Sequence, residues 1–180
     1  QPYGYVLSHE AVKFDVTEEN STEESGVTIV AVKLGNYAQK GIIKISKTGE
    51  VFASVTAADG VYQPVYTVQG LAGATYEIKA AADIYTPDGT LRCSAGEVVD
   101  TETTGADGMA ESKPLYLGKY EITEMKAPDG MVINKDAHTA ELVYAGQEIE
   151  ITETAASFCN DRQKARISLS KVLEQNKPVS

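Results

Sequence analysis

Short runs in which apolar and polar residues alternate, each closed by a turn, most constrain the fold of this chain. Successive side chains of a strand point to opposite faces, so such runs predict strands with one face in a core. The clearest run is KGIIKISK at 40–47, and we expect it to end at Thr48-Gly49. No run has a convincing helical period beyond two turns. Further strand-like runs end at turns rich in Gly, Asp and Pro at 87–89, 105–108 and 127–130.

Two later runs, HTAELVY (138–144) and QEIEITETAASF (147–158), flank Ala145-Gly146 and predict a hairpin. Residues 50–70 lengthen the connection after the first strand, and the sequence leaves open whether they form a hairpin of their own or a lid. The chain has ten Tyr, three Phe and no Trp, and its many Thr, Val and Ile favour strands over helices. Many short strands separated by turns predict an all-β fold, either a sandwich or a barrel.

The chain also repeats part of itself. NYAQKGIIKISK (36–47) aligns without a gap to NDRQKARISLSK (160–171), with six of twelve positions identical. PYGYVL (2–7) matches PDGMVI (128–133), so the offset is 126 residues here and 124 in the first match, as an insertion in a loop would produce. A serial array of units follows. We expect residues 1–39 to end one unit, residues 40–163 to form a complete unit, and residues 164–180 to begin the next.

The units are expected to join through short connectors at 39–40 and 163–164. Because the chain is cut out of register with the repeat and does not begin with Met, we expect a fragment of a longer protein. Its incomplete ends leave strand edges without partners. The sequence leaves three outcomes open for them: packing onto the central unit, remaining frayed, or pairing head-to-tail with neighbouring chains.

The composition of the chain argues against some classes of binding partner. The net charge of −10 argues against nucleic acid and anionic membranes. No apolar stretch is long enough to cross a bilayer, and Gln1 begins no signal peptide. Cys93 and Cys159 lack any paired spacing, and the sequence leaves open whether they form a disulfide or stay free.

Motifs for a multiple-turnover enzyme are missing from the sequence. His9 and His138 occupy non-equivalent places in their units and have no partner motif. There is no Gly-rich phosphate loop, no GxSxG and no metal-ligand cluster. The acidic run EENSTEE (18–24) lacks the spacing of a calcium loop and is interpreted as a solvated connector. We therefore expect no multiple-turnover enzyme, no cofactor and no metal.

On three predicted strands of the complete unit, the face with apolar residues ends in a polar residue. These residues are Lys47, Glu124 and Asn160. The partial units do the same at Asn36 and Lys171. A polar residue at a strand end is ordinary, but Asn and Lys at equivalent places in two units favour a shared role. The apolar residues that precede the first three on the same faces are Ile43, Ile45, Tyr120, Ile122, Ala156 and Phe158.

A buried Lys, Glu and Asn have a specific chemistry. Burial away from water disfavours charge, a neutral amine is a nucleophile, and a protonated carboxyl can donate to a carboxamide oxygen and polarise its carbon. Attack of the Lys47 amine on the Asn160 carboxamide would expel ammonia and leave an amide between the side chains, with Glu124 as proton shuttle. A dry core holds the reactants in contact, so no cofactor, metal or outside enzyme is needed.

These residues lie in motifs that resemble the CnaB or SpaA-type domain of Gram-positive surface proteins. The motifs are KISK, then LAGATYEI (71–78), then LGKYEITEMKAPDG (117–130), then a final strand with Asn160. The resemblance covers the complete unit from end to end. Met131 departs from it, because the family usually has an aromatic residue there, as the preceding copy does at Tyr5.

The resemblance implies a transthyretin-like or prealbumin-like (reverse Ig-like) β-sandwich of the CnaB type. Within it, Lys47 and Asn160 would form an intramolecular isopeptide bond, and Glu124 would be its catalyst. Asn36 and Lys171 would be the half-pairs of the flanking copies.

The resemblance also implies a structural stalk or spacer repeat of an adhesin or pilin-like protein in the cell wall of a Gram-positive bacterium. Its partners would be neighbouring repeats of the same polypeptide. The alternative is an adhesin module that binds a host protein or a glycan, with Tyr62, Tyr66 and Tyr85 lining the surface. A pilus backbone subunit is a third hypothesis, without an evident sorting signal or polymerising lysine motif here. Repetition in series favours the spacer, because a tip needs only one copy.

Overall fold

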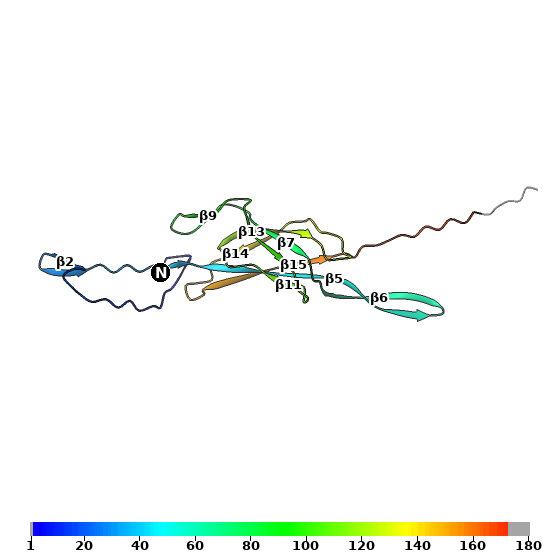
Figure 1. Ribbon diagram of the computed structural model, residues 1–180, viewed down its shortest axis with the longest axis horizontal. Coiled ribbons are helices and arrows are strands. Elements are labelled where there is room, and N and C mark those ends of the chain that lie inside the picture. Colours follow the sequence, from blue (N-terminus) through cyan, green and yellow to red (C-terminus); the bar gives the residue numbers. More distant parts are fainter. Residues whose placement is uncertain (1, 173–180) are drawn as a thin grey trace, which may run out of the picture.

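The computed structural model describes residues 2–172, which form an all-β sandwich of two sheets with extensions at both ends (Figure 1). The predicted fold class is confirmed. The first sheet has four antiparallel strands in the order β10-β7-β13-β14. Their bounds are β7 Thr75–Ala80, β10 Val98–Thr103, β13 Gly118–Lys126 and β14 His138–Leu142.

The second sheet is built around the long strand β5. Strands β11 and β12 pair with it antiparallel along one edge, while β15 pairs with it in parallel along the other. The first and last strands of the sandwich are therefore direct neighbours. The bounds are β5 Lys40–Ala58, β6 Val61–Gly70, β11 Met109–Glu111, β12 Leu115–Tyr116 and β15 Ile151–Asn160.

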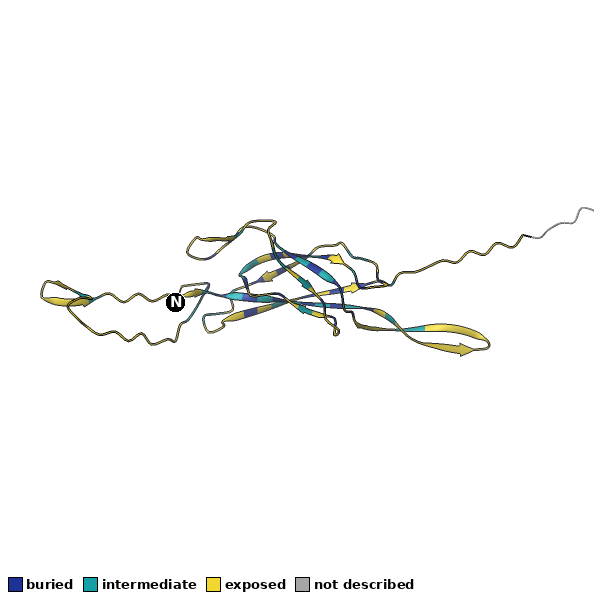
Figure 2. Cartoon of the chain, viewed as in Figure 1, coloured by how far each residue is buried: buried dark blue, intermediate teal, exposed yellow. Residues whose placement is uncertain are grey.

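The core lies between the two sheets and follows the alternation of the sequence. Every second residue of β7 and of the first half of β5 is buried, as expected for strands with one face covered. Figure 2 shows that buried residues gather in the centre of the molecule, whereas the extensions are exposed. The large apolar side chains of the core are Ile43, Ile45, Tyr76, Ile78, Tyr120, Ile122, Leu142 and Phe158.

The predicted end of the first strand at Thr48-Gly49 is wrong. β5 continues to Ala58 and pairs with β6, so residues 50–70 form a hairpin that projects from the sandwich (Figure 1). Gly49 is not a turn residue but a point of close approach: a Cβ atom there would lie 2.7 Å from Leu71 and 3.0 Å from the Asn160 carbonyl oxygen. The true turn is at Asp59 and Gly60, both with positive φ.

The predicted hairpin around Ala145-Gly146 is also wrong. β14 pairs with β13 in the first sheet and β15 with β5 in the second, so residues 143–150 cross from one sheet to the other. The same residue types, such as glycine, occur in the turn of a hairpin and in such a crossover. The local sequence therefore could not distinguish the two connections. The predicted turns at 87–89, 105–108 and 127–130 are confirmed.

The N-terminal segment packs onto the sandwich only in part. β1 (Tyr5–Val6) pairs with β4 (Tyr37–Ala38) beside the start of β5. Between them, residues 8–36 project away and end in a hairpin of β2 (Ser21–Glu24) and β3 (Val27–Val30) (Figure 1). Residues 164–172 extend from the opposite end, and the rest of the predicted next unit lies outside the described residues.

A second small hairpin, β8 (Ile84–Tyr85) with β9 (Leu91–Cys93), lies at the rim of the sandwich. Cys93 and Cys159 are both free, so the open question of a disulfide is answered. Within residues 2–172 no helix is long and apolar enough to cross a membrane. In the same part of the chain, no three His, Cys, Asp or Glu side chains could hold a metal ion together.

Candidate functional site

Three strands bring Lys47, Glu124 and Asn160 together at one end of the core. Lys47 lies on β5 opposite Phe158 of β15, and Asn160 lies two residues further along β15, opposite Gly49. Directly opposite residues share a face of the sheet, so Lys47 and Asn160 are diagonal neighbours on the buried face. Glu124 reaches them from β13 in the other sheet.

All three side chains are removed from water. The exposed fractions are 0% for Lys47, 2% for Glu124 and 3% for Asn160. The aromatic rings of Tyr76 and Phe158 flank the amine, each with its centroid 5.9 Å from Lys47 Nζ. The charged and polar groups therefore interact in an apolar surrounding, where electrostatic contacts are stronger than in water.

The polar atoms of the site satisfy one another. Lys47 Nζ lies 2.8 Å from Glu124 Oε1 and donates a hydrogen bond to Asn160 Oδ1. Asn160 Nδ2 donates to both carboxylate oxygens of Glu124, at 3.0 Å each. The sequence-based hypothesis had Glu124 donating to the carboxamide oxygen, but here the carboxamide nitrogen faces Glu124 and the oxygen faces Lys47. Both nitrogen atoms of a Lys-Asn condensation, Lys47 Nζ and Asn160 Nδ2, thus already lie beside the Glu124 carboxylate, with which they can exchange protons.

Sequence analysis missed two groups at the site. The backbone N–H of Asn134 donates to Glu124 Oε2 at 2.8 Å and fixes the carboxylate, a contact that no residue pattern can reveal. Tyr76 is the direct cross-strand partner of Glu124, next to a bulge of β13 that lies between Glu124 and Lys126. The position of Tyr76 on the buried face of ATYEI was the available signal.

The hydroxyl of Tyr76 is buried and has no hydrogen-bond partner within the described residues. Burial raises the pKa of Tyr76, and the carboxylate of Glu124 raises it further. The ring packs against Phe158 with centroids 4.6 Å apart, and Phe158 also contacts the ring of His138 at 4.4 Å. His138 thus belongs to the aromatic wall of the site.

The candidate half-pairs of the flanking copies lie outside this cluster. Asn36 and Lys171 are both exposed, in segments without regular strand structure. Their proposed partners would belong to units that this chain does not complete, so their role stays a prediction.

The tyrosines of the alternative ligand-binding hypothesis do not form one surface. Tyr62 is exposed near the tip of the β5–β6 hairpin, whereas Tyr85 is exposed on β8. The β5–β6 hairpin and the β8–β9 hairpin lie at opposite ends of the sandwich (Figure 1). Tyr66 is covered by Arg162, whose guanidinium carbon lies 3.7 Å from the ring centroid.

A family model and a known protein match parts of this sequence. The family model SpaA, described as a prealbumin-like fold domain, matches residues 65–155. The trypsin-resistant surface T6 protein of Streptococcus pyogenes serotype M6 is 31% identical over 74 residues, which are 40% of this chain and 14% of that protein. The chain thus spans a small part of that relative's length.

Solved structures show similar chains. The Bacillus anthracis TIE protein has a TM-score of 0.48 and 22% identity, covering 89% of this chain and 23% of that one. GBS52, the minor pilin of Streptococcus agalactiae, has a TM-score of 0.44 and 16% identity, covering 89% and 61%. The match of the family model to half of the sequence decides the assignment: this chain belongs to the SpaA family of prealbumin-like fold domains.

Proposed function

We propose that this chain is a stalk module of a Gram-positive cell-surface protein, pilin-like or adhesin-like, strengthened by an intramolecular isopeptide bond between Lys47 and Asn160. Glu124 promotes the bond. The observation that carries the proposal is the mutual contact of these three side chains in the dry core. Lys and Glu are almost never fully buried unless paired, and a buried ion pair is a poor source of stability, so a chemical role explains the cluster better.

The contacts support a complete proton route. Glu124 accepts a proton from Lys47 across the 2.8 Å contact, which leaves a neutral amine and a neutral acid. Lys47 Nζ attacks Cγ of Asn160, and Glu124 gives its proton to Nδ2, which it contacts at 3.0 Å. Glu124 then takes a second proton from Nζ, the Cγ–Nδ2 bond breaks, and ammonia leaves. The product is an amide, and Glu124 ends protonated after a single turnover.

The bond suits a module in a serial array. It closes a loop of 113 residues, and by analogy with a disulfide of that span it would stabilise the unit by about 4–5 kcal/mol. An amide is not reduced, so the link suits an exposed surface. One relative is named as a surface protein, which supports a cell-surface location. The internal sequence repeat supports neighbouring repeats as partners.

Intact mass spectrometry of the purified chain tests the proposal. We expect a mass lower than that of the sequence by one ammonia, and tandem spectra of a tryptic digest should contain the Lys47 and Asn160 peptides joined. Glu124→Gln keeps the size of the side chain but removes the proton shuttle, so its full mass should be retained.

The matched control is Glu153→Gln. Glu153 pairs with Lys44 at 2.7 Å across the same two strands, but on the exposed face. This variant should still lose ammonia. A wild-type protein of unshifted mass would refute the isopeptide bond and leave only the fold assignment.

A further inference from the structure

We propose that consecutive units of the array dock through an ordered interface, here called the joint, that fixes their relative orientation. The joint consists of residues 3–7 and 37–39, which end one unit, and residues 86–87 and 144–149 of the unit that follows. The inference rests on the proposed tandem array, but it concerns how units are held together and not the bond within a unit.

Gln39 is the centre of the joint. It was expected in a short connector between units, yet its exposed fraction is 1%. Its side-chain amide donates to the carbonyl oxygens of Gly146, at 2.9 Å, and of Ile149, and its side-chain oxygen accepts from the N–H of Ala145 at 2.9 Å. One buried side chain thus satisfies three backbone groups of the crossover that links the two sheets of the following unit. A flexible linker would make no such contacts.

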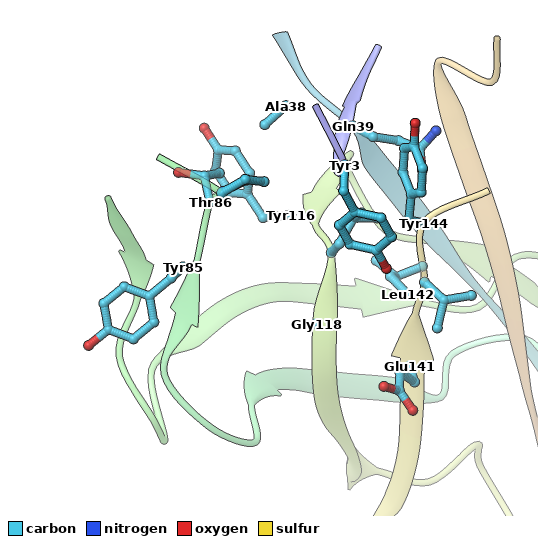
Figure 3. Close-up of a pocket in the computed structure, with 14 residues that line it drawn as sticks. Tyr3, Ala38, Gln39, Tyr85, Thr86, Tyr116, Gly118, Glu141, Leu142 and Tyr144 are labelled. Atoms are coloured by element: carbon cyan, nitrogen blue, oxygen red, sulfur yellow. The ribbon is translucent and has the colours of Figure 1, made fainter. Parts of the chain in front are cut away.

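Residues 3–7 add a second set of contacts. The ring of Tyr3 packs on that of Tyr144 with centroids 4.6 Å apart, and the N–H of Leu7 donates to the carbonyl oxygen of Gln147 at 2.9 Å. Gly4 has a φ of +85°, and a Cβ atom there would lie 2.6 Å from Pro87 Cγ. Figure 3 shows Tyr3, Gln39 and Tyr144 around the cavity of about 270 Å³ that remains between the two sides.

The far end of the complete unit repeats the geometry of the near end. The N–H of Gln39 donates to the carbonyl oxygen of Gly4 at 2.8 Å, and the N–H of Gln163 donates to that of Gly130 at 2.8 Å. These pairs are related by the sequence offsets of 124 and 126 residues. Residues 2–7 with 37–39 therefore have the structure of a unit's end. The strand pairs match as well: Tyr5 with Ala38, and Met131 with Arg162.

This repetition identifies the partner of the far end as the start of another copy of the unit. Within residues 2–172, the side-chain hydrogen bond of Gln163 goes to its own unit, at the carbonyl oxygen of Met131, 3.3 Å away. In the array it would enter the crossover of the next unit, as Gln39 does at 145–149. Tyr3 has Asp129 as its equivalent, so the aromatic contact is particular to the first joint.

Amide hydrogen exchange on the full chain, resolved by NMR, tests the joint. In the wild type the N–H groups of Leu7 and Ala145 should exchange much more slowly than those of residues 11–16 in the projecting segment. Gln39→Ala should accelerate both by on the order of tenfold or more, since it removes the bonds to the crossover. Gln39→Glu should have the same effect, because a carboxylate cannot donate to the two carbonyl oxygens.

The control is Gln163→Ala, the equivalent change at the unpartnered end, which should leave Leu7 and Ala145 protected. Wild-type exchange at Leu7 and Ala145 as fast as in residues 11–16 would overturn the joint, as would unchanged protection in both Gln39 variants. The ammonia loss is measured on the same samples, so failure of the joint and failure of the isopeptide bond are distinguished.

Discussion

Two lysine–glutamate pairs join β5 to other strands, one on its exposed face to β15 of the same sheet and one on its buried face to β13 of the facing sheet. Lys44 and Glu153 meet at 2.7 Å on the exposed face, where an ion pair contributes little to stability. Lys47 and Glu124 meet at 2.8 Å in the core, where desolvation opposes both charges. Conversion of the buried amine into an amide would remove the charge of Lys47 from the core. The proposed reaction would thus remove the desolvation penalty that this charge incurs on folding.

Tyr76 is the direct cross-strand partner of Glu124, and its ring flanks the amine of Lys47. Its buried hydroxyl makes no hydrogen bond within the described residues, although the Glu124 carboxylate is near enough to affect its pKa. An unsatisfied buried hydroxyl costs about 1–3 kcal/mol, so Tyr76→Phe should unfold at the same or a higher temperature than the wild type. Ammonia loss should remain complete, as read by intact mass. A lower melting temperature, or an incomplete mass shift, would mean that the hydroxyl does bond to Glu124.

Single residues of the site were predictable where strand parity applied. Lys47, Glu124 and Asn160 could be identified because each continues an apolar face. The pairing of β5 with β15 brings Lys47 and Asn160 together, and the packing of the two sheets adds Glu124. The bond from the Asn134 backbone and the direction of the Asn160 carboxamide were not predictable. Both depend on the path of a loop and on local hydrogen bonds, and the residue types of the strands do not determine either.

One glycine, Gly108 in the turn before β11, contacts the backbone of β5 at Lys47. The N–H of Lys47 donates to the carbonyl oxygen of Gly108 at 2.7 Å, and its own carbonyl oxygen accepts from the N–H of Leu71 at 2.9 Å. Gly108 has a φ of +78°, and a Cβ atom there would lie 2.4 Å from the carbonyl oxygen of Lys47 and 2.7 Å from Leu71 N. The turn before β11 thus packs directly against the backbone of Lys47.

Gly108→Ala should therefore destabilise the unit strongly and leave part of the chain without the cross-link. The matched control is Gly89→Ala, because Gly89 has a φ of +81° and open space around its Cα. The control should lose only about 1–2 kcal/mol from the strained φ, with its ammonia loss intact. Urea unfolding and intact mass of both variants provide the comparison. Equal losses of stability in the two variants would show that the close contacts at Gly108 do not contribute to the stability of the unit.

Elements were predictable as far as local pattern reaches. Runs with strict alternation, such as 40–47 and 118–124, became strands with the expected face buried. The errors concern connections. Gly49 was taken for a turn because glycine marks both turns and close contacts, and Ala145-Gly146 for a hairpin because a crossover between sheets uses the same residues. Which strands pair is decided by the whole core, and a local window does not contain that information.

For the whole molecule, the parallel pairing of β5 with β15 decides how a pulling force acts. The chain enters the sandwich at the start of β5 and leaves it at the end of β15, and these points lie at opposite ends of the ladder. Pulling on the termini therefore shears the two strands past each other along their full pairing. With an amide between Lys47 and Asn160, the load would pass from the first half of β5 directly into the exit of β15, and the rest of the sandwich would carry none.

Single-molecule pulling on the full chain, held at its two ends, gives the corresponding prediction. In Glu124→Gln the 113-residue loop between Lys47 and Asn160 should be released on unfolding, which adds about 400 Å of extension at roughly 3.5 Å per residue. In the wild type this extension should be absent at any force below covalent rupture, while segment 8–36 extends early in both proteins. Glu153→Gln should behave as the wild type. A wild-type trace that contains the long extension would mean that force reaches the core, because no covalent link then diverts it from β5 into β15.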